Sequence, residues 1–228
     1  MTPIRTRPEQ LWVGMVLAAV GGFLDAYTFV SHGVFATAQT GNVVLLAIDA
    51  ANARWDRIAA HLPPVIAFLL GVGLAETIAR PRVRAWLRRP TRVVLGAEIL
   101  VLAVIGVLPA STTPMVTTVA ISFVAALQIS TFNLLGDTSY NTTMITGNLR
   151  TMLAAAHRWL LDRQPAAGRR ALDLAAVVVA FVLGAVISAM LTRVWGPPAI
   201  LVGAALLATV LVGLVLQTRR LEARVGGR

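Results

Sequence analysis

The chain has 228 residues, of which 57% are hydrophobic and 13% are charged, and its formal net charge is +10. A soluble domain carries about 25% charged residues, so this composition excludes an ordinary soluble enzyme and a disordered chain. It indicates a membrane protein instead. There is no cysteine and the three histidines are scattered, so the sequence offers no metal-ligand spacing and we expect no cofactor.

Six apolar runs have about the 20 residues that a helix needs to cross the hydrocarbon core. Each half of the chain holds three of them, together with one shorter apolar run of about 20 Å helical length, too short to cross comfortably. From the N-terminus, residues 1–110 give spans over about 11–30, 60–79 and 92–108 and a short helix over 40–53, and residues 111–228 give spans over about 115–135, 171–193 and 198–217 and a short helix over 146–161.

The arginines decide whether the two short runs cross the membrane. All twenty Lys-plus-Arg positions are Arg, and most of them stand in blocks near 5–7, 80–92, 158–170 and 219–228. Short cytoplasmic loops are enriched in such residues. Eight crossings would place the 80–92 block outside, whereas six crossings place all four blocks and both termini in the cytoplasm. The short runs then enter and leave on one side, either as re-entrant half-helices or as helices lying on the membrane surface.

The two halves of the chain resemble each other. Thr40-Gly41-Asn42 recurs as Thr146-Gly147-Asn148, each time opening a short run, and Ala67-Phe68-x-Leu-Gly71 recurs as Ala180-Phe181-x-Leu-Gly184. Asp25-x-x-Thr28-Phe29 aligns with Gln128-x-x-Thr131-Phe132. Three crossings per half start the second half on the opposite side, so we expect an all-α membrane domain built from two inverted 3+3 repeats. Half-helix starts in such repeats can meet near the midplane and build a solute or ion site.

The strings GGFLDAYTF…TGNVVLL and LQISTFN…TTMITGNLRTM resemble the YoaK-like family of small bacterial membrane proteins, over nearly the whole chain. One departure is Ile129, where we would expect a polar Asn. The resemblance implies an inner-membrane protein of about six helices, without an established activity. The motif residues that it marks in this sequence are Asp25, Thr28, Gln39, Thr40, Gly41, Asn42, Gln128, Thr131, Thr146, Gly147, Asn148 and Arg150.

Ionisable residues inside spans are functional-site hypotheses by default. Asp25 could exchange protons with a transported solute, or it could be an interfacial carboxylate hydrated by the outer loop. Arg150 could pair with Asp25 or with an anionic substrate, or its side chain could extend to the headgroups. Glu98 could pair across helices or line the pathway. Asp49, in the first short run, is expected to be hydrated at the outer surface.

The asparagines that open the short runs have two compatible roles. Asn42 and Asn148 could cap these helices, line the path, or do both. The glycine before each of them allows close backbone approach.

Three functions remain open. The leading hypothesis is a channel or transporter for a small solute or ion, with its site where the two Thr-Gly-Asn starts meet. The alternatives are a structural or partner-binding membrane subunit and an intramembrane enzyme acting on lipid or quinone. The sequence contains no HExxH, GxSxG or Cys, so we expect no enzyme. The Arg blocks are explained by topology and anionic lipid headgroups rather than nucleic acid, and a homo-oligomer remains open.

Overall fold

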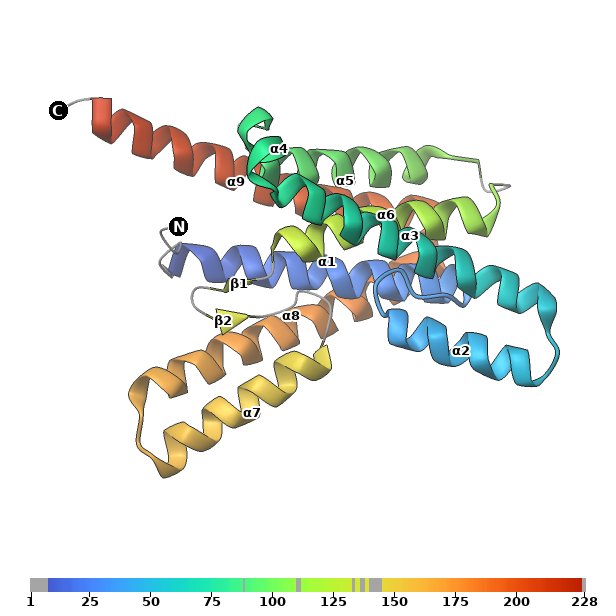
Figure 1. The fold of residues 1–228 in the computed structure, drawn as a ribbon, viewed down its shortest axis with the longest axis horizontal. Coiled ribbons are helices and arrows are strands. Elements are labelled where there is room, and N and C mark those ends of the chain that lie inside the picture. Colours follow the sequence, from blue (N-terminus) through green and yellow to red (C-terminus); the bar gives the residue numbers. More distant parts are fainter. Residues whose placement is uncertain are drawn as a thin grey trace.

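The computed structural model describes residues 8–87, 89–109, 112–132, 134–135, 138–139 and 145–226, and they form an elongated bundle of helices (Figure 1). Arg5, Arg7, Arg88 and Arg228 of the arginine blocks lie outside these residues. In chain order the elements are α1 (Pro8–His32), α2 (Gln39–Ala51), α3 (Trp55–Ala79), α4 (Pro81–Trp86), α5 (Pro90–Val107), α6 (Pro114–Thr131), β1 (Leu134–Leu135), β2 (Thr138–Ser139), α7 (Ile145–Leu161), α8 (Pro165–Trp195), the 3-10 turn η1 (Pro197–Ala199) and α9 (Ile200–Gly226).

Proline sets many of these helix starts. α4, α5, α6 and α8 each begin with proline in the first turn, where the missing N–H has no helical partner to lose. The short helix α4 was not expected from the sequence. α6 ends at Thr131, before the expected 135, because the chain turns into the antiparallel pair of β1 and β2.

Six of the described helices are long and apolar enough to cross a membrane. They are the described part of α1 from Leu11 onward, α3, α5, α6, α8 and the stretch Pro197–Arg220. Their outward faces carry large apolar side chains, such as Leu69 at 63% exposed and Leu100 at 64%. Such faces suit hydrocarbon, which is no less apolar than leucine. The chain is therefore a multi-pass membrane protein, as its composition predicts.

Two helix pairs, α1 with α8 and α3 with α6, make the most extensive contacts in the described bundle. Glycines bring their backbones together. A Cβ on Gly22 of α1 would collide with the carbonyl oxygen of Phe181, and one on Gly184 of α8 with that of Ala19. On α3, a Cβ at Gly71 would lie 2.5 Å from the carbonyl oxygen of Phe123 in α6. Small residues at such crossings are the usual means of close packing in membranes.

The main apolar core surrounds α1. Leu17 and Phe23 of α1 are fully buried against Leu95 and Leu102 of α5 and Leu207 of α9. α1 thus contacts α8, α9 and α6, and side chains of α5 join the same apolar core. The short helices α2 and α7 lie outside this core, against α3 and α8 respectively. They extend from the middle of the bundle toward opposite ends (Figure 1).

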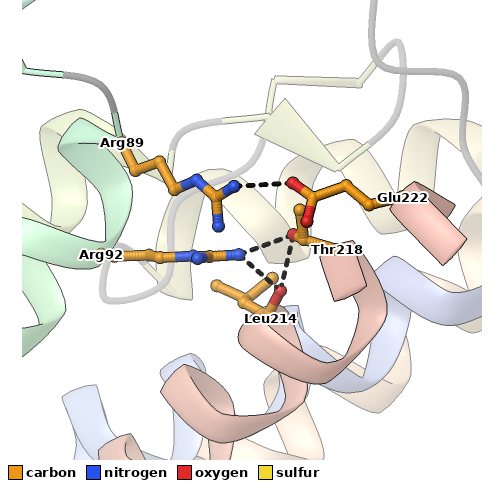
Figure 2. A network of polar contacts seen from close by, with 5 residues as sticks. All are labelled: Arg89, Arg92, Leu214, Thr218 and Glu222. Atoms are coloured by element: carbon orange, nitrogen blue, oxygen red, sulfur yellow. Dashed lines mark hydrogen bonds and ion pairs between the residues drawn. The ribbon is translucent and has the colours of Figure 1, made fainter. Parts of the chain in front are cut away.

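The first turn of α5 is tied to the last turns of α9 (Figure 2). Arg92 donates from Nη2 to the carbonyl oxygen of Leu214 at 3.0 Å and to Oγ1 of Thr218 at 2.6 Å. Arg89 pairs with Glu222 at 2.8 Å, and both of these side chains are well exposed. These contacts bring part of the 80–92 arginine block and the C-terminal helix to the same end of the bundle.

Candidate functional site

Asp25 lies on α1 about two turns before its end, and it is 6% exposed. Its Oδ1 accepts hydrogen bonds from the backbone N–H of Thr37 at 2.7 Å and of Ala38 at 3.3 Å. Its Oδ2 accepts a bond from the Thr37 hydroxyl at 2.6 Å. Because Ala38 is the N-cap of α2, Asp25 binds the unpaired N–H groups that precede this helix. The carboxylate thereby holds the start of α2 beside α1.

Asn42 closes the loop between α1 and α2. Its Nδ2 donates to the carbonyl oxygen of Phe35 at 2.7 Å and to Oε1 of Gln39 at 3.0 Å, while its Oδ1 accepts from the N–H of Phe35 at 2.9 Å. Gln39 in turn donates to the carbonyl oxygen of Ala36. Gly41 makes room for this arrangement, since a Cβ there would lie 2.9 Å from the Phe35 ring. The first Thr-Gly-Asn motif therefore builds a fixed loop, and the asparagine does more than cap.

A cavity of about 880 Å³ lies where α2 and α7 begin. Thr40 lines it from the first Thr-Gly-Asn motif, and Thr146 and Gly147 line it from the second. Asp25 and Gln39 also belong to its wall. The remaining lining residues are mostly apolar: Gly22, Ala26, Phe29, Val30, Phe35, Thr37, Ala38, Phe68, Ile129, Ile145, Phe181 and Ala185.

In the second motif the structure separates the expected residues. Asn148 is buried, at 3% exposed, whereas Thr146, Gly147 and Arg150 are exposed. A Cβ on Gly147 would meet no described atom within 4 Å. Pairing with Asp25 is one of the alternatives for Arg150, and it is not among the ion pairs of the described residues. The carboxylate is taken by Thr37 and Ala38, and the exposed Arg150 is absent from the described lining of the cavity.

Glu98 and Gln128 form a separate polar pair between α5 and α6. Glu98 is fully buried and Gln128 is 2% exposed. In the amide orientation that satisfies both groups, the Gln128 nitrogen donates to the two Glu98 oxygens at 2.8 and 2.9 Å. Neither residue is among the described lining of the cavity. The pairing across helices is thus the alternative for Glu98 that the geometry favours over lining the pathway.

The two motif threonines of the spanning helices lie outside the described cavity wall. Thr28 is fully buried and its hydroxyl donates to the carbonyl oxygen of Leu24 at 3.0 Å, within α1. Thr131 is half-buried at the last residue of α6.

A charged cluster that the sequence did not reveal joins α2 to α3. Asp49 is 5% exposed rather than hydrated. Its carboxylate lies 3.2 Å from Nε2 of His61 and 3.5 Å from Nε of Arg54. Nδ1 of His61 is buried with no hydrogen-bond partner. The hairpin between the helices brings the three residues together, and a scan for motifs at short spacing does not detect such a contact.

The phenylalanines of the cavity wall were also missed as site residues. Phe29, Phe35, Phe68 and Phe181 come from α1, the loop before α2, α3 and α8. In an apolar chain, phenylalanine is usually assigned to core or lipid contact. A signal was nevertheless present, since Phe68 and Phe181 occupy the same position of the internal repeat.

Comparison with known proteins adds the family. No curated protein and no solved structure matches the chain. A family model described as "Protein of unknown function (DUF1275)" matches residues 13–213, which include every described residue of the cavity wall. The chain therefore belongs to the DUF1275 family of proteins of unknown function.

Proposed function

We propose that the protein is a channel or transporter for a small solute, and that the cavity between the starts of α2 and α7 is its site. The observation that carries this proposal is the shared wall: Thr40 and Thr146, the first residues of the two Thr-Gly-Asn motifs, line one cavity of about 880 Å³. Ligand cavities typically measure about 300–1,000 Å³ and lie between helices in bundles. We infer that the likeness to YoaK-like proteins and the membership of the DUF1275 family are one relationship.

The packing favours an internal two-fold axis through the cavity. The repeat pairs α1 with α6, α2 with α7, α3 with α8, and α5 with α9. Under this exchange the α1–α8 contact corresponds to the α6–α3 contact, and the α2–α3 contact corresponds to the α7–α8 contact. The α5–α6 contact likewise corresponds to the α9–α1 contact. Each contact has its counterpart among the described helices. Repeat-equivalent residues also face the cavity in pairs, Thr40 with Thr146 and Phe68 with Phe181. In inverted-repeat transporters, the substrate site lies at such an interface.

The depth at which α2 begins supports a re-entrant half-helix over a helix lying on the surface. Its N-cap is bonded to Asp25, which lies seven residues, or about 10 Å, before the end of α1. The chain thus folds back into the bundle before α2 starts. Irregular backbone at that depth is tolerated where protein or a cavity surrounds it. The exposed Val43, Val44 and Ile48 give α2 a face suited to lipid.

In this proposal the protein lies in the bacterial inner membrane with both termini and the 80–92 block in the cytoplasm. The chain has no cysteine, so single-cysteine variants report orientation directly. Trp86 is 92% exposed in α4 and Trp55 is 73% exposed at the start of α3. A membrane-impermeant maleimide added to intact spheroplasts is expected to label Trp55→Cys and to spare Trp86→Cys until the cells are lysed. The reverse pattern would invert the topology.

A blocking substitution tests the site without knowledge of the substrate. Gly147 lines the cavity and a Cβ there would meet no described atom within 4 Å, so Gly147→Leu is expected to fill part of the cavity. Gly73 of α3 is its matched control, since a Cβ there also meets nothing within 4 Å and Gly73 does not line the cavity. Proteoliposomes are subjected to osmotic shock with urea, glycerol or benzamide, and solute entry is followed by light scattering, with a trapped pH dye reporting protons.

The expected result is entry of at least one of these solutes with the wild-type protein and with Gly73→Leu, and a loss of about tenfold or more with Gly147→Leu. Equal entry through both variants would place the path elsewhere. No flux of any probe above protein-free liposomes, combined with a stable complex on gentle purification, would favour the partner-binding subunit instead. Turnover of a lipid or quinone would favour an enzyme.

A further inference from the structure

The described part of the cavity wall has almost no charge to offer a ligand. Among the described lining residues, Asp25 is the one ionisable side chain, and both of its oxygens already accept hydrogen bonds from Thr37 and Ala38. A carboxylate that is engaged in this way has little capacity left for a cation. Arg150, which could have attracted an anion, is exposed on α7 and does not belong to the described wall.

The amides at the cavity are engaged as well. Gln39 donates to the carbonyl oxygen of Ala36 and accepts from Asn42, so both ends of its side chain serve the loop. Among the side chains of the described wall, the hydroxyls of Thr40 and Thr146 make no hydrogen bond to described residues and are left for a bound molecule; both residues are exposed, at the starts of α2 and α7. A hydroxyl both donates and accepts, which suits a neutral polar group.

Aromatic rings make up much of the rest of the described cavity wall. Phe29 and Phe35 are stacked, with ring centroids 4.5 Å apart and an interplanar angle of 16°. Phe68 and Phe181 enter from α3 and α8. Aromatic rings pack favourably against other rings in offset or edge-to-face geometry, with a gain beyond the burial of area. Phenylalanine attracts cations less than tryptophan does, and no tryptophan is among the described lining residues.

We infer that the cavity takes an uncharged aromatic solute, a planar ring carrying one neutral hydrogen-bonding group. The ring packs between the phenylalanines and the polar group bonds to the threonine hydroxyls. This inference rests on the proposed function, because it names the substrate class of the same site. A lipid acyl chain is the competing apolar occupant, but it leaves both hydroxyls unused and gains nothing from ring geometry. An acyl chain is therefore an outcome of the test.

Four probes of similar size separate these cases. Benzamide is neutral, benzoate is an anion, benzamidine is a cation, and hexanamide carries the same amide as benzamide without a ring. Their binding is measured by isothermal titration calorimetry with the full chain in lipid nanodiscs, after subtraction of empty nanodiscs. Benzamide is expected to bind at least tenfold more tightly than each of the other three.

Two cavity variants and one control link this binding to the site. Phe68→Leu and Phe181→Leu keep an apolar side chain but remove the ring, and each is expected to weaken benzamide binding about fivefold to tenfold. Phe123→Leu is the control, because Phe123 is a half-buried phenylalanine that does not line the cavity. Thermal unfolding of each variant shows that it is folded before affinities are compared.

The outcomes distinguish this inference from the proposed transport. Binding of benzoate or benzamidine as tight as that of benzamide would overturn the uncharged class, and tighter binding of hexanamide would indicate an acyl-chain groove. Unchanged affinity in both cavity variants would overturn the site. Benzamide binding without flux of any solute would leave the ligand class standing and refute transport. Flux of urea or glycerol without benzamide binding would support transport and refute the aromatic ligand class.

Discussion

The loop before α2 depends on the shape of the Asp25 side chain, and substitutions at this position test that dependence. Asp25→Ala removes the acceptor of three hydrogen bonds, from the N–H groups of Thr37 and Ala38 and from the Thr37 hydroxyl. Asp25 is 6% exposed, so water cannot freely replace these bonds. Each buried donor left without a partner costs about 1–3 kcal/mol.

The two short bonds to Thr37 dominate the total, since the bond to Ala38 is longer at 3.3 Å. Their loss amounts to about 3–5 kcal/mol, and the relief from burying a polar carboxyl group offsets part of it. We expect Asp25→Ala to lower the free energy of unfolding by about 3 kcal/mol. For a chain of this length that corresponds to a fall in Tm of roughly 6–12 °C.

Asp25→Asn is the matched variant, because its carbonyl oxygen can replace Oδ1 while its amide nitrogen donates to the Thr37 hydroxyl oxygen. We expect it to lose about 1 kcal/mol or less, a fall in Tm of no more than about 4 °C. The assay is thermal unfolding of the purified protein in one detergent, followed by tryptophan fluorescence. An Asp25→Asn protein that unfolds as early as Asp25→Ala would show that negative charge, rather than hydrogen-bond geometry, holds the loop.

Three further predictions use the same unfolding assay. Gly71→Ala is expected to lower the free energy of unfolding by about 2 kcal/mol, because its Cβ would lie 2.5 Å from a carbonyl oxygen of α6. Gly73→Ala on the same helix should be neutral or stabilising. Equal effects of the two substitutions would refute the close approach of the helices. Arg92→Ala should lower the free energy of unfolding by about 2 kcal/mol, because Arg92 is half-buried and donates two hydrogen bonds to α9. Arg89→Ala should lower it by less than about 1 kcal/mol, because the ion pair of Arg89 is exposed. High salt should abolish the effect of Arg89→Ala and leave that of Arg92→Ala. Asn42→Asp should unfold earlier than Asn42→Ala, because an oxygen would replace the nitrogen that lies 2.7 Å from a carbonyl oxygen; the opposite order would contradict the assigned amide orientation.

Most of the fold can be predicted from composition and from the lengths of the apolar runs. Six apolar helices follow from the apolar runs and from the proline-rich breaks between them, such as the one before α6, where Pro114 opens the helix. The exact ends of the helices are harder to predict from the sequence. α8 begins at Pro165, well before the expected 171, because a proline can open a helix in its first turn and the polar residues that follow it are compatible with helix. A hydropathy pattern detects the apolar part of a helix and misses the polar turns that continue it.

The candidate site shows the limit of the sequence more sharply. The repeat marks Asp25, yet its partner Thr37 lies 12 residues later in a loop whose path depends on packing against α1. Asp49 meets His61 in the same way, through a hairpin rather than a helical spacing. Comparison of the two halves of the sequence is enough to find the two Thr-Gly-Asn motifs. The phenylalanine wall cannot be assigned from type alone, because the same residue serves core, lipid and ligand.

The glycine contacts between helices constrain how the bundle can move. At Gly22 and Gly184 the backbones of α1 and α8 are in contact, and at Gly71 those of α3 and α6 are. Sliding or twisting within either pair would press backbone atoms together, so we expect each pair to move as one rigid unit. Each pair joins helices from different halves of the chain. If the protein is a transporter, as proposed, a rocking motion would turn the α1–α8 pair against the α3–α6 pair, and the cavity of about 880 Å³ that both pairs line would change shape between them.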